Sequence, residues 1–193
     1  MLFIIYLLII IKLSEGQIAE DGNCSVVESN KKIDISKFTG EWYEVANIPN
    51  EYEQFVKCTT FNLTLNSNKT IDIVVTSLGS IGGNVFQWQG LGTRSDENSM
   101  SYFIEFPELA IKGKTILTII DTDYVNYGIL FMCQNVGELR FEYASILSRK
   151  RKFNRNIFKH ARNTFKHNLL VAENLVRVDQ HNCPSSIEYN NDK

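Results

Sequence analysis

The residues of this 193-residue chain that are best suited to chemistry are its four cysteines and three histidines. Cys24, Cys58, Cys133 and Cys183 lie far apart, and none belongs to the close Cys-x-x-Cys pair that zinc sites usually contain. In an oxidising compartment, an even number of dispersed cysteines indicates two disulfides, and the sequence by itself allows three pairings. We therefore expect structural cross-links rather than a metal site or a thiol nucleophile.

The histidines offer no catalytic arrangement either. His160 and His167 fall in a predicted helix, where neither has an evident carboxylate partner, and His181 falls in the C-terminal tail. A general base or an activated nucleophile needs a partner within hydrogen-bond reach. No predicted strand carries a histidine that could bind haem iron. The sequence therefore predicts no catalytic residue, no metal and no cofactor.

The N-terminus predicts the compartment. Residues 1–11 are almost unbroken apolar sequence followed by Lys12, which is too short to span a bilayer and fits the apolar region of a signal peptide. The alternative is a buried N-terminal strand or helix. We expect a signal peptide over 1–16, one secreted domain over 17–183 and a tail over 184–193. Three glycosylation sequons agree with export, at Asn23, Asn62 and Asn68.

Eight apolar segments separated by turn residues make up most of the expected domain. Several are apolar on both faces, which indicates that something else covers part of the sheet. Their regular spacing is typical of an antiparallel meander that closes as a sandwich or barrel. The expected strands are 41–48, 58–65, 69–78, 85–94, 100–106, 114–122, 127–134 and 139–147.

A different pattern follows the eighth strand. Between residues 154 and 170 the apolar side chains recur at helical spacing. A single helix at this position in a β-rich chain can cover an exposed part of the sheet. Residues 174–179 then predict a short final strand.

Three short blocks occupy defined places in this pattern. Gly40-Glu41-Trp42 opens the first strand, Thr122-Asp123-Tyr124 lies between the sixth and seventh, and Arg149 follows the eighth. Trp42 can plug one end of a barrel, and the Arg149 guanidinium can stack on its indole and bind nearby carbonyls. Asp123 can fix a turn by accepting backbone N–H bonds. These roles are structural.

In this order, the three blocks resemble the signature regions of the lipocalin family. The segment 179–184 (Asp-Gln-His-Asn-Cys-Pro) is similar to the branch of apolipoprotein D and the insect bilin-binding proteins. The resemblance implies an all-β fold, an eight-stranded antiparallel up-and-down barrel with one C-terminal helix packed outside and a short ninth strand. It also implies the disulfides Cys24–Cys133 and Cys58–Cys183.

The same resemblance implies which side chains line the barrel. An outward Cys133 places Met132 and Gln134 inward by the two-residue period of a strand, and the family's pattern extends this parity to the other strands. Relatives often have tryptophan at the position of Ser145, which implies a wider interior here. The alternative is that the inward residues only fill a core. The expected ligand-binding residues are Ile73, Val75, Phe86, Trp88, Ile104, Phe106, Leu117, Met132, Gln134, Phe141 and Tyr143.

The segment 149–167 contains eight lysines or arginines and no aspartate or glutamate. Because the whole chain carries −2, the remainder carries −10. A solvated helix face that offsets an acidic barrel explains this asymmetry. The functional alternative is contact with an anionic membrane surface or a sulfated glycan, whereas export disfavours nucleic acid as a partner.

The resulting prediction is an extracellular carrier, not an enzyme, that binds an apolar or amphipathic molecule inside its barrel. A lipid, fatty acid, sterol or bilin fits such an interior. The alternative is a secreted lipocalin that acts through protein or membrane-surface contacts, for example as a protease inhibitor or a scavenger of mediators.

Overall fold

The computed structural model describes residues 18–25, 27, 29, 32–48, 53, 55–95, 101–107, 114–168, 170 and 173–187. The predicted signal peptide and the end of the predicted tail lie outside the described residues. Within that part of the chain, no helix has the length and apolar character needed to cross a bilayer.

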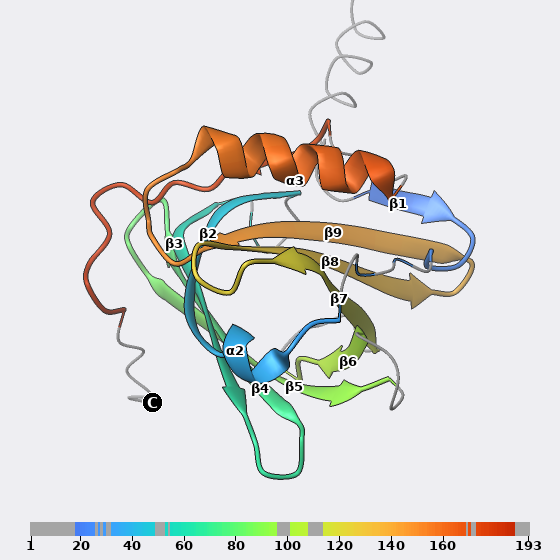
Figure 1. Ribbon diagram of the computed structural model, residues 1–193. Coiled ribbons are helices and arrows are strands. Elements are labelled where there is room, and N and C mark those ends of the chain that lie inside the picture. Colours follow the sequence, from blue (N-terminus) through green and yellow to red (C-terminus); the bar gives the residue numbers. More distant parts are fainter. Residues whose placement is uncertain are drawn as a thin grey trace, which may run out of the picture.

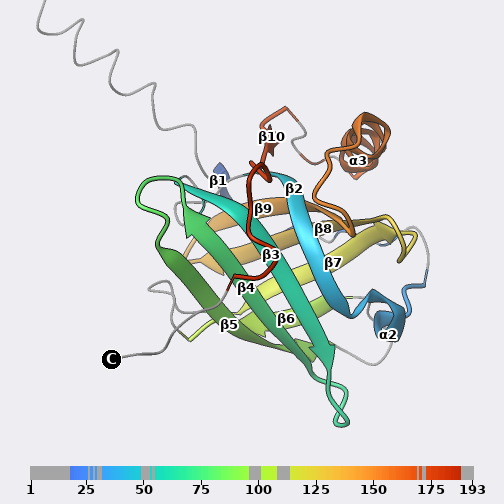
Figure 2. The same cartoon turned by 90° about the vertical axis from the view of Figure 1, so that its left-hand side faces the viewer.

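Eight consecutive antiparallel strands close into a barrel, because the last of them, β9, also pairs with the first, β2. This confirms the predicted fold class, and Figures 1 and 2 show the barrel from two directions. The strands are β2 (Gly40–Ile48), β3 (Val56–Leu65), β4 (Ile71–Gly79), β5 (Val85–Arg94), β6 (Ser101–Glu105), β7 (Thr115–Thr122), β8 (Tyr127–Val136) and β9 (Leu139–Ser148).

Four further elements lie outside the barrel ring. The predicted helix is α3 (Arg155–His167), and the predicted final strand shortens to β10 (Val176–Arg177), which pairs with β2. Two short elements were not predicted. They are β1 (Ile18–Asp21), which pairs with β9, and the single helical turn α2 (Ile35–Phe38).

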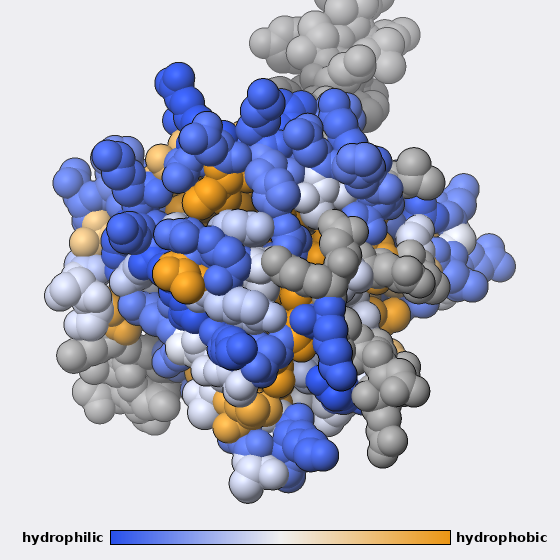
Figure 3. All heavy atoms as spheres, in the orientation of Figure 1, coloured by the Kyte–Doolittle hydropathy of each residue, from blue (hydrophilic) through white to orange (hydrophobic). Residues whose placement is uncertain are grey.

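Helix α3 explains why several strands are apolar on both faces. It lies along the outside of the barrel across β8 and β9 (Figure 1). Ala161 and Phe165 are fully buried there against outward side chains of the barrel, among them Ile129 and Ile146. The opposite side of α3 carries its charges, and the molecule's upper edge in Figure 3 is mostly hydrophilic. The barrel therefore has one apolar core inside and a second between sheet and helix.

Both cross-links join distant segments. The structure joins Cys24 to Cys133 and Cys58 to Cys183, the pairing that the resemblance implied. The first ties the segment after β1 to the outer face of β8. The second ties the C-terminal segment to the start of β3, where the red segment crosses the barrel wall in Figure 2.

Candidate functional site

One end of the barrel is closed by side chains. Trp42 is fully buried and stacks on Phe38 of α2 with ring centroids 4.7 Å apart, and its indole N–H donates to the Phe38 carbonyl. The Arg149 guanidinium lies 3.6 Å from the Trp42 ring centroid. It also donates to the carbonyls of Thr39, Glu41 and Tyr124. Arg149 therefore joins its own segment after β9 to the start of β2 and to the turn at Tyr124.

Two glycines leave room for this closure. A Cβ at Gly128 would lie 2.6 Å from the Phe38 ring, so a side chain there would displace α2. Gly40 has a φ of +89°, a conformation that side-chain-bearing residues rarely adopt, and it packs beside the Arg149 guanidinium. The glycine of the first sequence block thus serves the turn that leads into β2.

The block at 122–124 forms the turn beside the same end. The Asp123 carboxylate accepts backbone N–H bonds from Val125, Asn126 and Tyr127. Partial burial alone would raise the pKa of Asp123, but these hydrogen bonds outweigh it and hold the pKa below its usual value. The Thr122 hydroxyl accepts from the Tyr124 N–H and donates to the Tyr127 carbonyl.

The interior of the barrel lies above this closed end. Strand pairing places Met132 beside Leu117 and Gln134 beside Thr115, whereas Cys133 and Phe131 belong to the outer core under α3. The alternation therefore runs as the outward Cys133 implied. Seven of the expected ligand-binding residues belong to, or pack on, the inner core: Ile73, Val75, Trp88, Ile104, Phe106, Leu117 and Met132.

The four remaining candidates share the inward face. Phe86 pairs with the fully buried Ser77 and stacks near Trp88, although 42% of it is exposed at the rim. Gln134, Phe141 and Tyr143 sit in the inner rows of β8 and β9, because Gln134 pairs with Phe141 and Met132 with Tyr143. These placements bring the expected residues together on one inward face of the barrel.

Part of this interior is accessible to solvent. Trp88, Phe106 and Met132 face inward but are only partly buried, unlike Trp42 at the closed end. Opposite Phe106 lies Gly90, whose Cβ would come within 2.7 Å of the Phe106 ring. The half of the barrel farthest from α2 is thus lined by aromatic and sulfur-containing side chains that are not tightly enclosed.

A buried acid inside the barrel is the residue that sequence reasoning missed. Glu44 is fully buried, and its two carboxyl oxygens accept hydrogen bonds from Ser145 at 2.6 Å and Asn47 at 3.3 Å. The Asn47 amide also donates to Glu53. Burial raises the pKa of Glu44 well above its ordinary value, and the neighbouring Glu53 charge adds to the rise.

A simple signal could have found Glu44, because the period of two that places Trp42 inward also places residue 44 inward. Asn47 could not be found in this way. A register shift between Glu44 and Ala46 changes the parity of the strand. Ser145 does not simply widen the interior, as its hydroxyl is engaged by Glu44.

Glu44→Gln should change how stability depends on pH. A carboxyl whose folded pKa is raised keeps a proton that the unfolded chain releases, so the wild-type protein loses stability as pH rises above about 4.5. Glutamine keeps hydrogen-bonding capacity without that proton. Urea unfolding should show equal stabilities at pH 4 and a more stable Glu44→Gln variant at pH 7.

Glu142→Gln is the matched control for this measurement. Glu142 is also buried but lies 2.9 Å from the Arg140 guanidinium, so its substitution should lower stability at pH 7 by breaking that ion pair. A Glu44→Gln variant that is less stable than wild type at pH 7 would contradict the buried, protonated state.

Two histidines have an acidic partner among the described residues, and for the exposed His181 it is Asp179, two residues away, at 3.3 Å. His160 Nε2 lies 2.7 Å from Asp121 Oδ2, and the Tyr127 hydroxyl donates to the same carboxylate oxygen. The expectation that His160 lacks a carboxylate partner was therefore wrong, because 39 residues separate the two in sequence. The contact joins α3 to the outer wall of the barrel, and burial together with Asp121 raises the pKa of Tyr127.

Outside the barrel, a groove of about 730 Å³ separates the start of α3 from the C-terminal segment. Its lining includes Lys152, Phe153, Arg155 and Arg177, with the Arg177 guanidinium 3.9 Å from the Phe153 ring centroid. This places part of the predicted basic segment beside a second basic element, β10.

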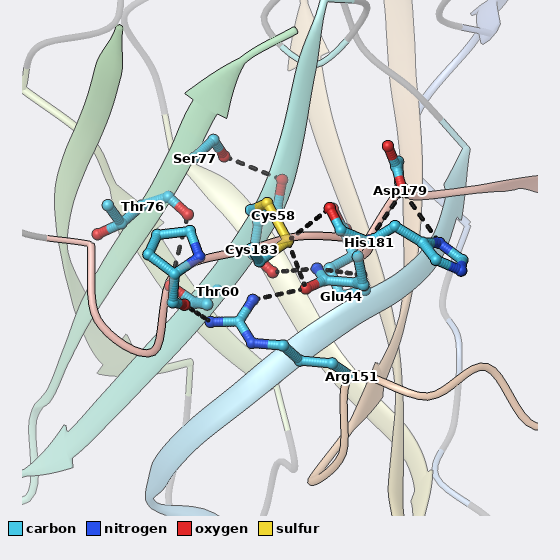
Figure 4. Close-up of a disulfide and its surroundings, with 12 residues drawn as sticks. Glu44, Cys58, Thr60, Thr76, Ser77, Arg151, Asp179, His181 and Cys183 are labelled. Carbon is cyan, nitrogen blue, oxygen red and sulfur yellow. Dashed lines mark hydrogen bonds and ion pairs between the residues drawn. A yellow bond between two sulfur atoms is a disulfide. The ribbon is translucent and has the colours of Figure 1, made fainter. Parts of the chain in front are cut away.

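Two of the eight basic side chains of segment 149–167 make contacts within the protein. Arg149 closes the barrel, and Arg151 bonds the Gln180 side chain and the Pro184 carbonyl while stacking over Tyr43. Figure 4 shows Arg151 reaching the C-terminal segment beside the Cys58–Cys183 disulfide. Arg155, Lys159 and Lys166 are exposed on α3.

Comparison with known proteins places this geometry among characterised folds. Residues 39–182 match the model of the lipocalin / cytosolic fatty-acid binding protein family. The chain is 28% identical to apolipoprotein D from Macaca fascicularis over 177 residues, which is 89% of each chain. It is 24% identical to bilin-binding protein from Pieris brassicae over 130 residues, 66% of each. Apocrustacyanin C1 superimposes with a TM-score of 0.72 at 22% identity, covering 86% of this chain and 93% of the other.

Proposed function

This chain belongs to the lipocalin family, and we propose that it is an extracellular carrier that holds an apolar or amphipathic small molecule in the barrel. The observation that carries the proposal is the set of inward aromatic and aliphatic side chains that are only partly buried, above all Trp88, Phe106 and Met132. The relative from Pieris brassicae binds a bilin, as its name states. Two long-range disulfides support an oxidising compartment.

The hydrophobic effect supplies the affinity in this proposal. Burial of roughly 300 Å² of ligand surface would contribute about 7 kcal/mol before the costs of association. Micromolar binding then requires no charge pair in the interior. Export, cleavage of a signal peptide over 1–16 and glycosylation at Asn23, Asn62 and Asn68 belong to the same proposal. Asn62 and Asn68 are both exposed.

Filling the interior should abolish binding of an apolar probe. We expect N-phenyl-1-naphthylamine to bind the wild-type protein and to lose at least tenfold in affinity in Met132→Trp, because the larger ring occupies the space beside Leu117 and Tyr143. Probe fluorescence in a titration measures this directly. Phe103→Trp is the control, since Phe103 points outward under Lys114. Equal loss in both variants, or no binding to wild type, would contradict the carrier proposal.

A second function is favoured by the basic groove. Lys152 and Arg155 line the groove with Arg177, and Lys159 is exposed one helical turn further along α3. Juxtaposed basic side chains contribute about 1 kcal/mol each at such a surface. Contact with anionic membranes would place the carrier where apolar molecules are exchanged.

Charge reversal at Lys152, Arg155 and Lys159 should weaken binding to vesicles with 30% phosphatidylserine by about 100-fold. Arg151 is left unchanged, because it holds the C-terminal segment. Lys69→Glu with Lys114→Glu changes net charge elsewhere on the exposed surface and serves as the control. Vesicle co-sedimentation that responds equally to both sets would show a general charge effect and no defined surface.

A further inference from the structure

Two polar side chains inside the barrel have no hydrogen-bond partner among the residues that the structure describes. Tyr102 is 3% exposed and Gln134 is 5% exposed, and neither side chain makes a hydrogen bond within the part of the chain that the structure describes. Among those residues, every fully enclosed side-chain nitrogen or oxygen does have a partner. The Tyr102 hydroxyl and the Gln134 amide therefore border accessible space, although most of each side chain is buried.

Both belong to the interior described above. Tyr102 pairs with Leu117, which pairs with Met132, so the hydroxyl lies in one inward row across β6, β7 and β8. Gln134 lies in the next row towards the turn between β8 and β9, beside Thr115. Standard strand spacing places the two Cα atoms about 12 Å apart, within the length of one lipid-sized ligand.

The charge of the interior limits what these groups can hold. The buried ionisable side chains among the described residues are Glu44, Asp121 and Glu142, all of them acidic, and Glu44 faces inward. Arg94 lies opposite Tyr102 in the inward row, but its side chain is exposed to solvent. A ligand carboxylate buried here would meet no buried cation in that part of the chain, and leaving such a charge unpaired costs several kcal/mol. A carboxylate head group therefore fits poorly beside Gln134.

An ammonium group fits no better at the buried acid. Both oxygens of Glu44 already accept hydrogen bonds, from Ser145 and Asn47, and the side chain is fully enclosed. A neutral amide or hydroxyl group on the ligand needs no oppositely charged partner in the interior. The Gln134 amide offers one acceptor and two donors, and the Tyr102 hydroxyl offers both roles.

We propose that the carrier selects an uncharged amphipathic molecule, whose amide, carbonyl or hydroxyl group binds Gln134 and Tyr102 while its apolar body packs along the inward aromatic residues. The inference rests on the proposed carrier function and names its ligand class. It narrows the expected cargo by removing carboxylate-headed lipids.

Three probes with the same chain length test the head-group preference. Decanamide, decanoate and decylamine are used to displace N-phenyl-1-naphthylamine at pH 7.5. We expect decanamide to bind at least tenfold more tightly than decanoate and decylamine. Decanoate or decylamine binding as tightly as decanamide would overturn the proposal.

Near-isosteric variants test the two residues. Gln134→Leu and Tyr102→Phe together should weaken decanamide binding at least tenfold, and by a clearly larger factor than they weaken N-phenyl-1-naphthylamine binding. Gln89→Leu is the matched control, because this exposed glutamine lies on the outer face of β5 and bonds only Gln87 among described residues. Unchanged decanamide affinity in the double variant would overturn the assignment.

The two levels of failure are distinguishable. Wild-type protein that does not bind N-phenyl-1-naphthylamine at all contradicts the carrier function itself. Wild-type protein that binds this probe but shows no preference for decanamide contradicts only the ligand class.

Discussion

Removing the Cys58–Cys183 disulfide should lower the free energy of unfolding by about 5 kcal/mol in the chain-entropy model, because the bridge closes a loop between residues 125 apart. Paired substitution, Cys58→Ala with Cys183→Ala, avoids a free thiol. Urea unfolding of the oxidised wild type and the variant measures the difference. An equilibrium change below about 1 kcal/mol would contradict the expectation.

The second disulfide provides the matched control. Cys24–Cys133 spans 109 residues, so the same model gives it nearly the same value. The two differ in what they hold. Gln180, three residues before Cys183, donates to the carbonyls of Glu44 and Thr59 and accepts from Arg151. Only loss of Cys58–Cys183 should therefore release the backbone at Arg177 for cleavage by trypsin and disrupt the basic groove.

Trp42→Ala should cost about 3–5 kcal/mol of stability, the range found when a large buried aromatic side chain is truncated. Trp42 is fully buried, stacks on Phe38 and lies under Arg149, so truncation opens a void and leaves the guanidinium without its ring. Urea unfolding measures the loss. Far-ultraviolet circular dichroism would confirm that the folded variant keeps its barrel.

Trp88→Ala is the informative comparison, since it is the other tryptophan of the chain. Trp88 also faces the interior but is only partly buried, so its truncation should cost much less than that of Trp42. Its probe affinity should nevertheless fall, because a lining ring is lost. Equal stability losses for the two tryptophans would mean that the half of the barrel farthest from α2 is packed as tightly as the closed end. A carrier needs room for a ligand there, so this result would contradict the proposed function.

Measuring the pH dependence of unfolding and the affinity for ligands in the same variants would distinguish residues that stabilise the fold from residues that select the ligand. Glu44 is enclosed and bears on stability, whereas Gln134 and Tyr102 border accessible space and bear on the ligand. A variant at the first position should therefore shift the pH dependence of unfolding with little change in head-group preference. Variants at the other two should do the reverse.

Most of the barrel could be predicted from sequence because its signals are local. Strand ends agree with the structure to within about two residues, since alternating apolar residues and turn residues are read over short windows. The helix over 155–167 follows from its own periodicity. The elements that escaped are too short for a periodic signal. Four residues make up β1, which forms only against the edge of β9, and four make up α2.

The roles of Trp42, Asp123 and Arg149 also followed from residue type and position, with the family resemblance giving their order. The hydrogen-bond partners of the polar groups in the interior could not be predicted in the same way. Gln134 was placed inward by parity, but whether protein groups form hydrogen bonds with Gln134 and Tyr102 depends on every neighbouring strand at once. Asn47 reaches Glu44 only because the strand register shifts between them.

The sequence by itself therefore determined the strands, the covering helix, the cysteine count and the basic segment, all of which depend on composition and short-range period. Only the tertiary structure decided which charged side chains make contacts within the protein and which remain exposed to solvent. Asp121 meets His160 across 39 residues, and Arg151 meets Gln180 across 29. Pairings of this kind depend on how the chain closes in space, and no local pattern encodes them.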